Sequence, residues 1–257
     1  MMPMRDAAAV VVWRDEGAAL GVYMLKRGSR LAAFPSVWAF PGGSVDAEDR
    51  VRRRGDPAPD AQILTAWCAR VESGPLAVAQ DAFMLWAEPQ FRARLGYVPS
   101  EPWADVRADP EGNRAALVAA IRELGEETGW WVGARPDVRV SAEPRAIEPS
   151  APEWKDGAGS APVPDWGRLA YIGRLITPPH ERVRFNCRFF AVESDDGRLL
   201  DWPAGEATEA RWVRVDEVLA QDAAAFPLAM PTRYLLERLA LTPPAVLRGL
   251  TLRERLG

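Results

Sequence analysis

Apolar and polar residues alternate in short runs near both ends of the chain, and this pattern predicts strands. Residues 6–13 and 21–27 are apolar runs separated by the polar segment 14–19, as in two neighbouring strands joined by a turn. A short strand before Pro41-Gly42-Gly43 is expected to lead into a tight glycine turn. The predicted strands are residues 6–13, 21–27, 38–40, 169–176, 183–193 and 210–215.

A helix is predicted in the middle of the chain, at residues 113–131. Gly129 stands where a left-handed residue commonly ends a helix. Either Asn113 or Asp109, which is followed by a proline, can begin it. At about 100° per residue, one narrow stripe of this helix is apolar and predicts its buried face. The residues of the stripe are Leu117, Ile121, Leu124 and Thr128.

Three glutamates of this helix, Glu123, Glu126 and Glu127, form a cluster away from the apolar stripe. Their spacing of i, i+3 and i+4 makes the carboxylates neighbours, and three like charges repel one another. Arg122, one turn before Glu126, compensates only part of this charge. A hard divalent cation such as Mg²⁺ or Mn²⁺ would reverse the repulsion. The simpler alternative is a solvated acidic face.

The segment before this helix, residues 50–112, has prolines at both ends and helical spacing at residues 61–71 and 76–95. Beyond the helix, residues 137–141 predict a short strand and residues 142–167 an irregular loop rich in Pro, Gly, Ala and Ser. Further helices are predicted at residues 216–221 and, in two pieces separated by Pro243-Pro244, from residue 231 onward.

Composition narrows the classes of function. The chain has 257 residues, 48% of them hydrophobic, which is enough for a sizeable core. A net charge of −4 without a long basic run argues against a nucleic-acid partner. His180 is the only histidine, so a multi-histidine zinc site is excluded. Two cysteines make no disulfide framework, and the apolar run 7–13 is too short to span a membrane. We therefore expect a cytoplasmic protein with no membrane partner.

The residues around the predicted helix resemble the Nudix box, whose pattern is G-x5-E-x7-R-E-U-x-E-E-x-G-U, with U a hydrophobic residue. In the first half, Gly43 fits the leading glycine, but Asp49, with Glu48 beside it, stands at the glutamate position. Residues 50–112 then interrupt the box. The second half is matched throughout, by Arg122, Glu123, Leu124, Glu126, Glu127, Gly129 and Trp130.

The resemblance implies an α/β fold, a Nudix-type α/β/α sandwich with a mixed β-sheet. It implies a single domain over residues 1–257, with 50–112 as a helical insertion inside the box. The role of the insertion stays open between packing against the sheet and forming a lid, a pocket wall or the surface of a homodimer. The implied ligands of Mg²⁺ or Mn²⁺ are the carbonyl of Gly42 and the side chains of Glu123, Glu126 and Glu127.

The resemblance also implies catalytic roles. Arg122 is expected to orient the glutamates and to pair with Asp49 or Glu48 in place of the family glutamate. The general base comes either from the box, where Glu126 is the candidate, or from a later loop, where Glu206 and Glu209 are the candidates. A surface role for the two later glutamates is the simpler alternative.

The implied activity is hydrolysis of the diphosphate in a small-molecule nucleoside diphosphate derivative. The split box resembles the branch that includes peroxisomal coenzyme A diphosphatases, which implies CoA or acyl-CoA as substrate and 3′,5′-ADP and (acyl-)phosphopantetheine as products. The residues expected to bind substrate are Arg27, Arg30, Trp38 and Arg182.

Two alternatives stay open. One is hydrolysis of ADP-ribose or a nucleotide-sugar, because a fold fixes the substrate poorly. The other is a Nudix-fold protein that binds or regulates without turnover. All three glutamates of the second half of the box are present, which favours hydrolysis.

Overall fold

The computed structural model describes residues 4–31, 34–51, 59–72, 109–132, 164–177, 183–194 and 207–256. Its strands are β1 (Met4–Asp15), β2 (Leu20–Arg27), β3 (Trp38–Ala39), β4 (Gly42–Ser44), β5 (Ala170–Ile176), β6 (Arg184–Glu193) and β7 (Ala207–Arg214). Its α-helices are α1 (Ala61–Glu72), α5 (Pro110–Thr128), α6 (Val215–Ala220), α7 (Met230–Ala240), α8 (Pro244–Arg248) and α9 (Leu252–Leu256). Two short 3₁₀ helices cover Glu48–Arg50 and Trp166–Arg168.

The strands form one mixed sheet with β1 in its middle. Its order is β3-β2-β1-β6-β5, with β4 also paired to β1 and β7 to β2. The β1–β6 pair is parallel, whereas β1 pairs with β2 and β4 in the antiparallel direction. Val10, Val11 and Val12 of β1 are fully buried, as expected for a central strand covered on both faces.

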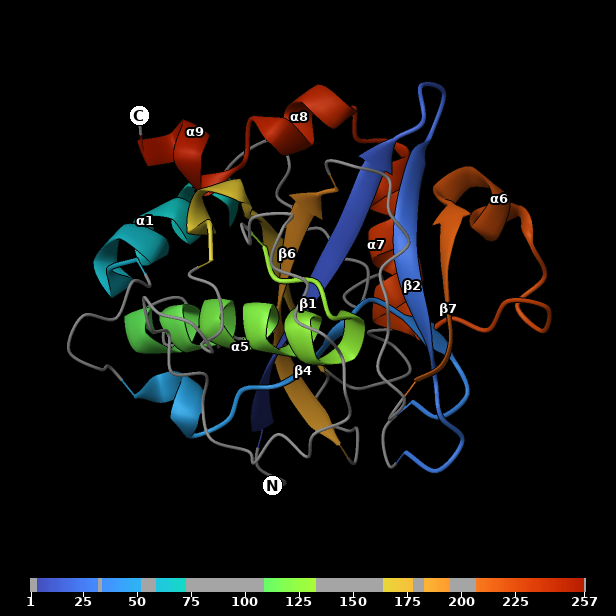
Figure 1. Cartoon of the computed structure of the whole chain (residues 1–257), viewed down its shortest axis with the longest axis horizontal. Helices are drawn as coiled ribbons and strands as arrows, with labels where there is room; N and C mark the ends of the chain where they lie inside the picture. Colours follow the sequence, from blue (N-terminus) through green and yellow to red (C-terminus); the bar gives the residue numbers. More distant parts are fainter. Residues whose placement is uncertain are drawn as a thin grey trace, which may run out of the picture.

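Helices cover both faces of this sheet. In Figure 1, α5 crosses in front of β1 and β6, while α7 lies behind the sheet, between β1 and β2 in this view. α1 packs against α5 and β5, and its Trp67 side chain donates a hydrogen bond to the carbonyl of Leu250. The described part of the insertion therefore packs into the core. Residues 76–95, predicted as a second helix, and 137–141, predicted as a strand, lie outside the described residues, and the assignment of one domain stays a prediction.

The central helix α5 starts at the earlier of its two predicted caps and stops before Gly129, so it covers residues 110–128 instead of 113–131. Asp109 caps it by accepting a hydrogen bond from the backbone N–H of Gly112 at 2.8 Å. Gly129 follows its last residue with φ 71°, the left-handed conformation of a helix stop. All four residues of the predicted stripe are at most 1% exposed, namely Leu117, Ile121, Leu124 and Thr128.

Hydrogen bonds also fix the start of α5 to the sheet. The side-chain oxygen of Asn113 accepts from Arg174 of β5 at 2.9 Å and from Arg188 of β6 at 2.7 Å. Both arginines are buried, and Arg188 lies beside Asp6 of β1 and Asp109. The helix is thereby held in one position along the strands, which determines where its glutamates lie.

Two details differ from the predictions. The expected glycine turn is instead the short strand β4, which pairs with β1 because residues without side chains can approach another backbone closely. The C-terminal end forms three helices instead of two, with α9 following α8.

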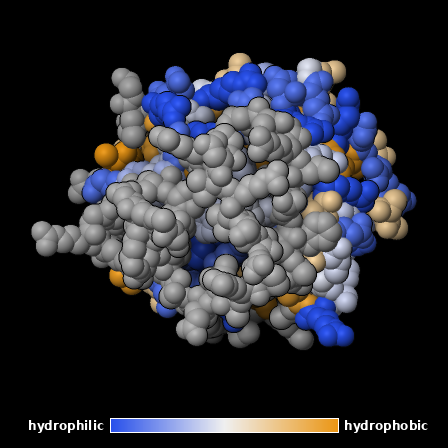
Figure 2. Space-filling model, viewed as in Figure 1, coloured by the Kyte–Doolittle hydropathy of each residue, from blue (hydrophilic) through white to orange (hydrophobic). Residues whose placement is uncertain are grey.

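No helix in the described ranges combines the length and hydrophobicity needed to cross a bilayer. In the view of Figure 2, the described surface is mostly hydrophilic, with apolar residues in small groups.

We predict that Gly42→Ala destabilises the protein by about 3 kcal/mol in urea unfolding. Gly42 has φ 153°, and an added methyl group would lie 2.3 Å from the carbonyl oxygen of Ala8 and 2.6 Å from Cα of Ala9. Gly17→Ala is the control, because Gly17 also has positive φ (79°) but has open space around it. We expect a loss of about 1 kcal/mol there. Equal losses in the two variants would contradict the close approach of β4 to β1.

Candidate functional site

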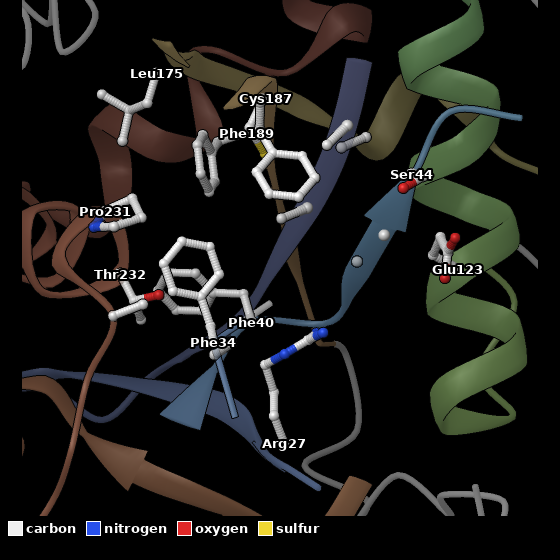
Figure 3. Close-up of a pocket in the computed structure, with 18 of the residues that line it drawn as sticks. Arg27, Phe34, Phe40, Ser44, Glu123, Leu175, Cys187, Phe189, Pro231 and Thr232 are labelled. Atoms are coloured by element: carbon white, nitrogen blue, oxygen red, sulfur yellow. The ribbon is translucent and has the colours of Figure 1, made fainter. Parts of the chain in front are cut away.

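A cavity of about 850 Å³ opens between α5, β4 and the ends of β5, β6 and α7. Carboxylates of α5 line one side, whereas aromatic and aliphatic side chains line the other. Figure 3 shows Glu123 beside β4 and, across the cavity, Phe34, Phe40 and Phe189. The guanidinium of Arg27 projects into the space between the two sides. All three glutamates of the predicted cluster line this cavity, as do Gly42 and Gly43.

The guanidinium of Arg122 joins the segments that form the carboxylate side. It makes two hydrogen bonds to Asp49, from Nε at 3.0 Å and from Nη2 at 2.9 Å. Its Nη1 donates to Glu123 and to Glu126, each at 3.0 Å. Its Nη2 also donates to the carbonyl oxygen of Ser44 in β4 at 3.0 Å. Of the two expected partners of Arg122, the structure therefore selects Asp49.

The glycine strand β4 lies directly against two of the glutamates. The backbone N–H of Gly42 donates a hydrogen bond to Oε2 of Glu127 at 2.8 Å. A methyl group added to Gly43 would lie 2.3 Å from Oε1 of Glu123. The two halves of the Nudix-like pattern thus meet in space, although residues 50–112 separate them in sequence. The absence of a side chain at Gly43 lets the carboxylate of Glu123 lie directly against its backbone.

The carboxylates lie in an environment that disfavours negative charge. Burial raises the pKa of Glu123 to about 7, with Arg122 opposing this effect and Glu126 adding to it. Burial also raises the pKa of Glu126, again opposed by Arg122. The pKa of Arg122 is raised, because Asp49, Glu123 and Glu126 outweigh the effect of its own burial. The cluster holds more negative charge than Arg122 neutralises.

The donor atoms of this cluster suit a hard divalent cation, because they are carboxylate oxygens on one wall of a cavity. Within the described residues, however, no group of three or more His, Cys, Asp or Glu side chains is arranged to hold a metal ion. The reason is visible in the contacts: Glu123 and Glu126 are turned to Arg122, and Glu127 is turned to Gly42. The carboxylate oxygens are of the right kind for a cation, but these side chains must rotate away from Arg122 and Gly42 to bind one. The set of ligands therefore stays a prediction.

Two residues expected in the site lie elsewhere. Glu209 is on β7, not on a loop; it pairs with Lys26 at 2.5 Å, which lowers its pKa, and it is not among the described residues that line the cavity. Trp38 is 1% exposed and stacks on Phe226 with the ring centroids 4.9 Å apart. Trp38 is therefore a core residue. Glu209 lies outside the cavity because β7 pairs with β2, which places Glu209 opposite Lys26.

The expected cationic residues divide into three groups. Arg27 lines the cavity, and Arg5, which the sequence did not single out, does so as well. Arg30 is exposed and is not among the described lining residues. Arg182 lies outside the described residues, as do Glu206 and His180.

Two further residues of the site, Ser44 and Phe34, do not stand out in the sequence pattern. Ser44 contributes its backbone carbonyl to Arg122, an interaction that does not depend on the side chain and leaves no sequence signal. Phe34 lines the cavity from the segment that follows β2. The available signal for Phe34 was its position in the sequence, after Arg27 and Arg30 and before Gly42-Gly43.

Comparison with family models and with curated proteins gave no match. Among solved structures, the chain is similar to a NUDIX hydrolase from Alicyclobacillus acidocaldarius, with 23% identity over 98% of this chain and 99% of that chain and a TM-score of 0.60. It also matches the NUDIX domain of Shewanella oneidensis NrtR complexed with ADP ribose (10% identity, 93% and 87% covered, TM-score 0.43) and the MutT protein from Methanosarcina mazei Go1 (13%, 92% and 93%, 0.43). The first likeness shows that the chain has the predicted Nudix fold.

We predict that Asp49→Asn destabilises the protein by about 3 kcal/mol, because it removes one charge of a buried ion pair and leaves Arg122 undercompensated. The side chain of Asp49 is fully buried and that of Arg122 is 9% exposed. Asp46→Asn is the control: its carboxylate is 3.4 Å from the same Nη2, but its side chain is 57% exposed. We expect less than about 1 kcal/mol there. Denaturant unfolding of both variants measures the difference, and similar losses would contradict a central role for the Arg122–Asp49 pair.

Proposed function

We propose that this protein hydrolyses the diphosphate of a nucleoside diphosphate derivative with the help of Mg²⁺ or Mn²⁺. The observation that carries the proposal is the meeting of the α5 glutamates and the β4 glycines on one wall of the cavity, with Arg122 linking them. The Nudix fold supports this proposal without fixing it, because one fold hosts several functions.

The residues that would hold the cation are Glu123, Glu126 and Glu127, together with the carbonyl of Gly42. When bound, such a cation neutralises charge on the diphosphate and lowers the pKa of a water for attack at phosphorus. Gly42 and Glu127 already share a hydrogen bond, so the strand and the helix are fixed relative to each other before substrate arrives.

Arg122 acts as a positioning residue. It holds Glu123 and Glu126 through a single nitrogen, Nη1, while Asp49 and Ser44 fix the opposite edge of its guanidinium. Glu126 takes the role of general base in place of Glu209, because its carboxylate faces the cavity and burial raises its pKa towards the range useful for proton transfer. Its side chain is 45% exposed, so water reaches it.

For the substrate we propose CoA or an acyl-CoA, cleaved to 3′,5′-ADP and (acyl-)phosphopantetheine. The split box that resembles the CoA diphosphatases supports this choice. A cavity of about 850 Å³ lies in the upper part of the usual range for small-molecule sites. Arg5 and Arg27 line the cavity and supply positive charge for phosphate groups beyond the diphosphate.

Replacing Glu127 with Gln should lower Mg²⁺-dependent diphosphate cleavage about hundredfold or more, because it removes the charge of a proposed ligand of the cation. The matched control is Glu209→Gln, which changes a carboxylate on β7 that pairs with Lys26 outside the cavity lining. We expect this control to keep the activity of the unmodified protein. Phosphate-containing products are quantified by chromatography. Cleavage that persists unchanged in Glu127→Gln would reject the catalytic assignment.

A panel of CoA, acyl-CoA, ADP-ribose and NADH, with identification of the products, tests the substrate. We expect turnover of the CoA compounds and release of 3′,5′-ADP. Turnover of ADP-ribose with CoA inert would replace our choice by a nucleotide-sugar diphosphatase. Binding without cleavage of any compound would favour a non-catalytic binding protein.

A further inference from the structure

The start of α7 forms part of the cavity wall across from the glutamates. Its first three residues, Met230, Pro231 and Thr232, all line the cavity, as does Ala229 before them. Figure 3 shows Pro231 and Thr232 on the side away from Glu123, with the hydroxyl oxygen of Thr232 turned towards the interior of the cavity. The first turn of this 11-residue helix thus opens into the same space as the carboxylates of α5.

This helix start has backbone donors that the protein leaves available to a ligand. Ala229, at the cap position, has no side-chain oxygen to accept from the first N–H groups, and Pro231 has no N–H. The N–H of Arg233 donates to the carbonyl of Ala229 at 3.0 Å. Within the described residues, the N–H groups of Met230 and Thr232 have no acceptor. Both belong to the positive end of the helix dipole.

The side chain of Thr232 is an independent indication of a ligand. The residue is only 5% exposed, yet its hydroxyl makes no hydrogen bond to any other described residue. Buried polar groups in proteins are normally satisfied, so a hydroxyl left open in a cavity wall indicates a place that a ligand completes. Because the side chains of a helix tilt towards its N-terminus, this hydroxyl is directed back towards the two N–H groups.

The charges around the cavity give it a negative side at α5 and a positive side at α7. Every carboxylate among the described lining residues belongs to α5, and the first turn of α7 contains no acidic residue. The other charged side chains in the described lining are those of Arg5 and Arg27. Without a bound cation, the glutamates repel an anion and the start of α7 attracts it.

Aromatic rings strengthen that attraction by limiting the room for water. Phe34, Phe40 and Phe189 line the cavity across from Glu123. Phe34 has φ 50°, in the left-handed region that bulky residues rarely adopt, so its position is maintained against backbone strain. Charged hydrogen bonds are stronger where the surroundings are apolar, because the local dielectric is low.

We infer that the start of α7 is a subsite for a second phosphate group of the substrate, and that Thr232 binds this group through its hydroxyl and its N–H. The inference rests on the proposed function for the placement of the diphosphate at the glutamates. Arg5 and Arg27 attract a phosphate, whereas the three donors of α7 also fix its position. A neutral base or ribose can accept such hydrogen bonds, but it leaves the positive helix end uncompensated.

The test is a calorimetric titration with inorganic phosphate in EDTA at fixed ionic strength, where no cation draws phosphate to the glutamates. For the unmodified protein we expect a dissociation constant of about 1 mM or lower. Thr232→Val keeps the shape of the side chain but removes its hydroxyl, and should weaken phosphate binding about tenfold. Thr232→Ser restores the hydroxyl and should bind within about twofold of the unmodified protein.

Thr177→Val is the matched control. Thr177 also lines the cavity, but its hydroxyl already accepts a hydrogen bond from the N–H of Phe185 at 3.0 Å. The same substitution at this position should therefore leave the affinity for phosphate within about twofold. Melting temperatures within about 4 °C of the unmodified protein show that both valine variants are folded.

Met230→Glu tests the same subsite without changing Thr232. Met230 is 52% exposed, and a carboxylate at this first helical position supplies the anion from the protein itself. We expect phosphate affinity to fall about tenfold or more while the melting temperature rises by about 1–4 °C, because an acidic residue stabilises the first turn of a helix. Met230→Gln, of the same length without the charge, should change neither quantity by as much.

Equal phosphate affinities in Thr232→Val and the unmodified protein would overturn the inference, as would the absence of phosphate binding to the unmodified protein. So would tighter binding of adenosine, a neutral probe, with an affinity that falls in Thr232→Val. The titration requires neither a cation nor cleavage, so its failure leaves the test of Glu127→Gln intact. Conversely, if Glu127→Gln cleaves as before while phosphate binds through Thr232, the catalytic assignment fails and the subsite stands.

Discussion

The site depends on one buried guanidinium. Arg122 of α5 binds both the backbone of β4 and Asp49 of the 3₁₀ helix that follows β4, so two segments before the insertion and one after it share one cation. Removing a guanidinium from water is costly, and the cost is offset only when its N–H groups are satisfied and its charge is paired. Asp49 supplies a bidentate partner, and the glutamates supply the rest. The ion pair that helps to hold the fold together therefore also sets the position of the reactive carboxylates.

The sequence predicted this centre because its signals are local or strongly patterned. The 3.6-residue period located the buried stripe of α5, and the box pattern related Asp49 to Arg122 across the insertion. Glu209 and Trp38 were misplaced because strand pairing decides which face a side chain occupies. β7 lies antiparallel to β2, which puts Glu209 opposite Lys26, and Phe226 covers Trp38. Such contacts join distant segments and leave no periodic trace in a single sequence.

The cavity joins two kinds of surface. Carboxylates and glycine backbone line one side, and a cluster of phenylalanines lines the other, with Arg27 between them. Nothing in the mean composition of the chain reveals this division, because each wall takes residues from several elements. The strained backbone at Phe34 indicates that the apolar side is maintained at a cost in stability, as is common where a residue contacts a ligand.

The pairing of β1 with β6 has a consequence for how the chain reaches its native state. Residues 4–13 form the centre of the sheet, yet their parallel partner is residues 184–193. During synthesis, the valine-rich first strand therefore waits for most of the polypeptide before one of its edges is covered. Contacts of such long range slow folding and leave an unpaired edge open to other chains. A newly made chain should accordingly benefit from chaperones until β6 has left the ribosome.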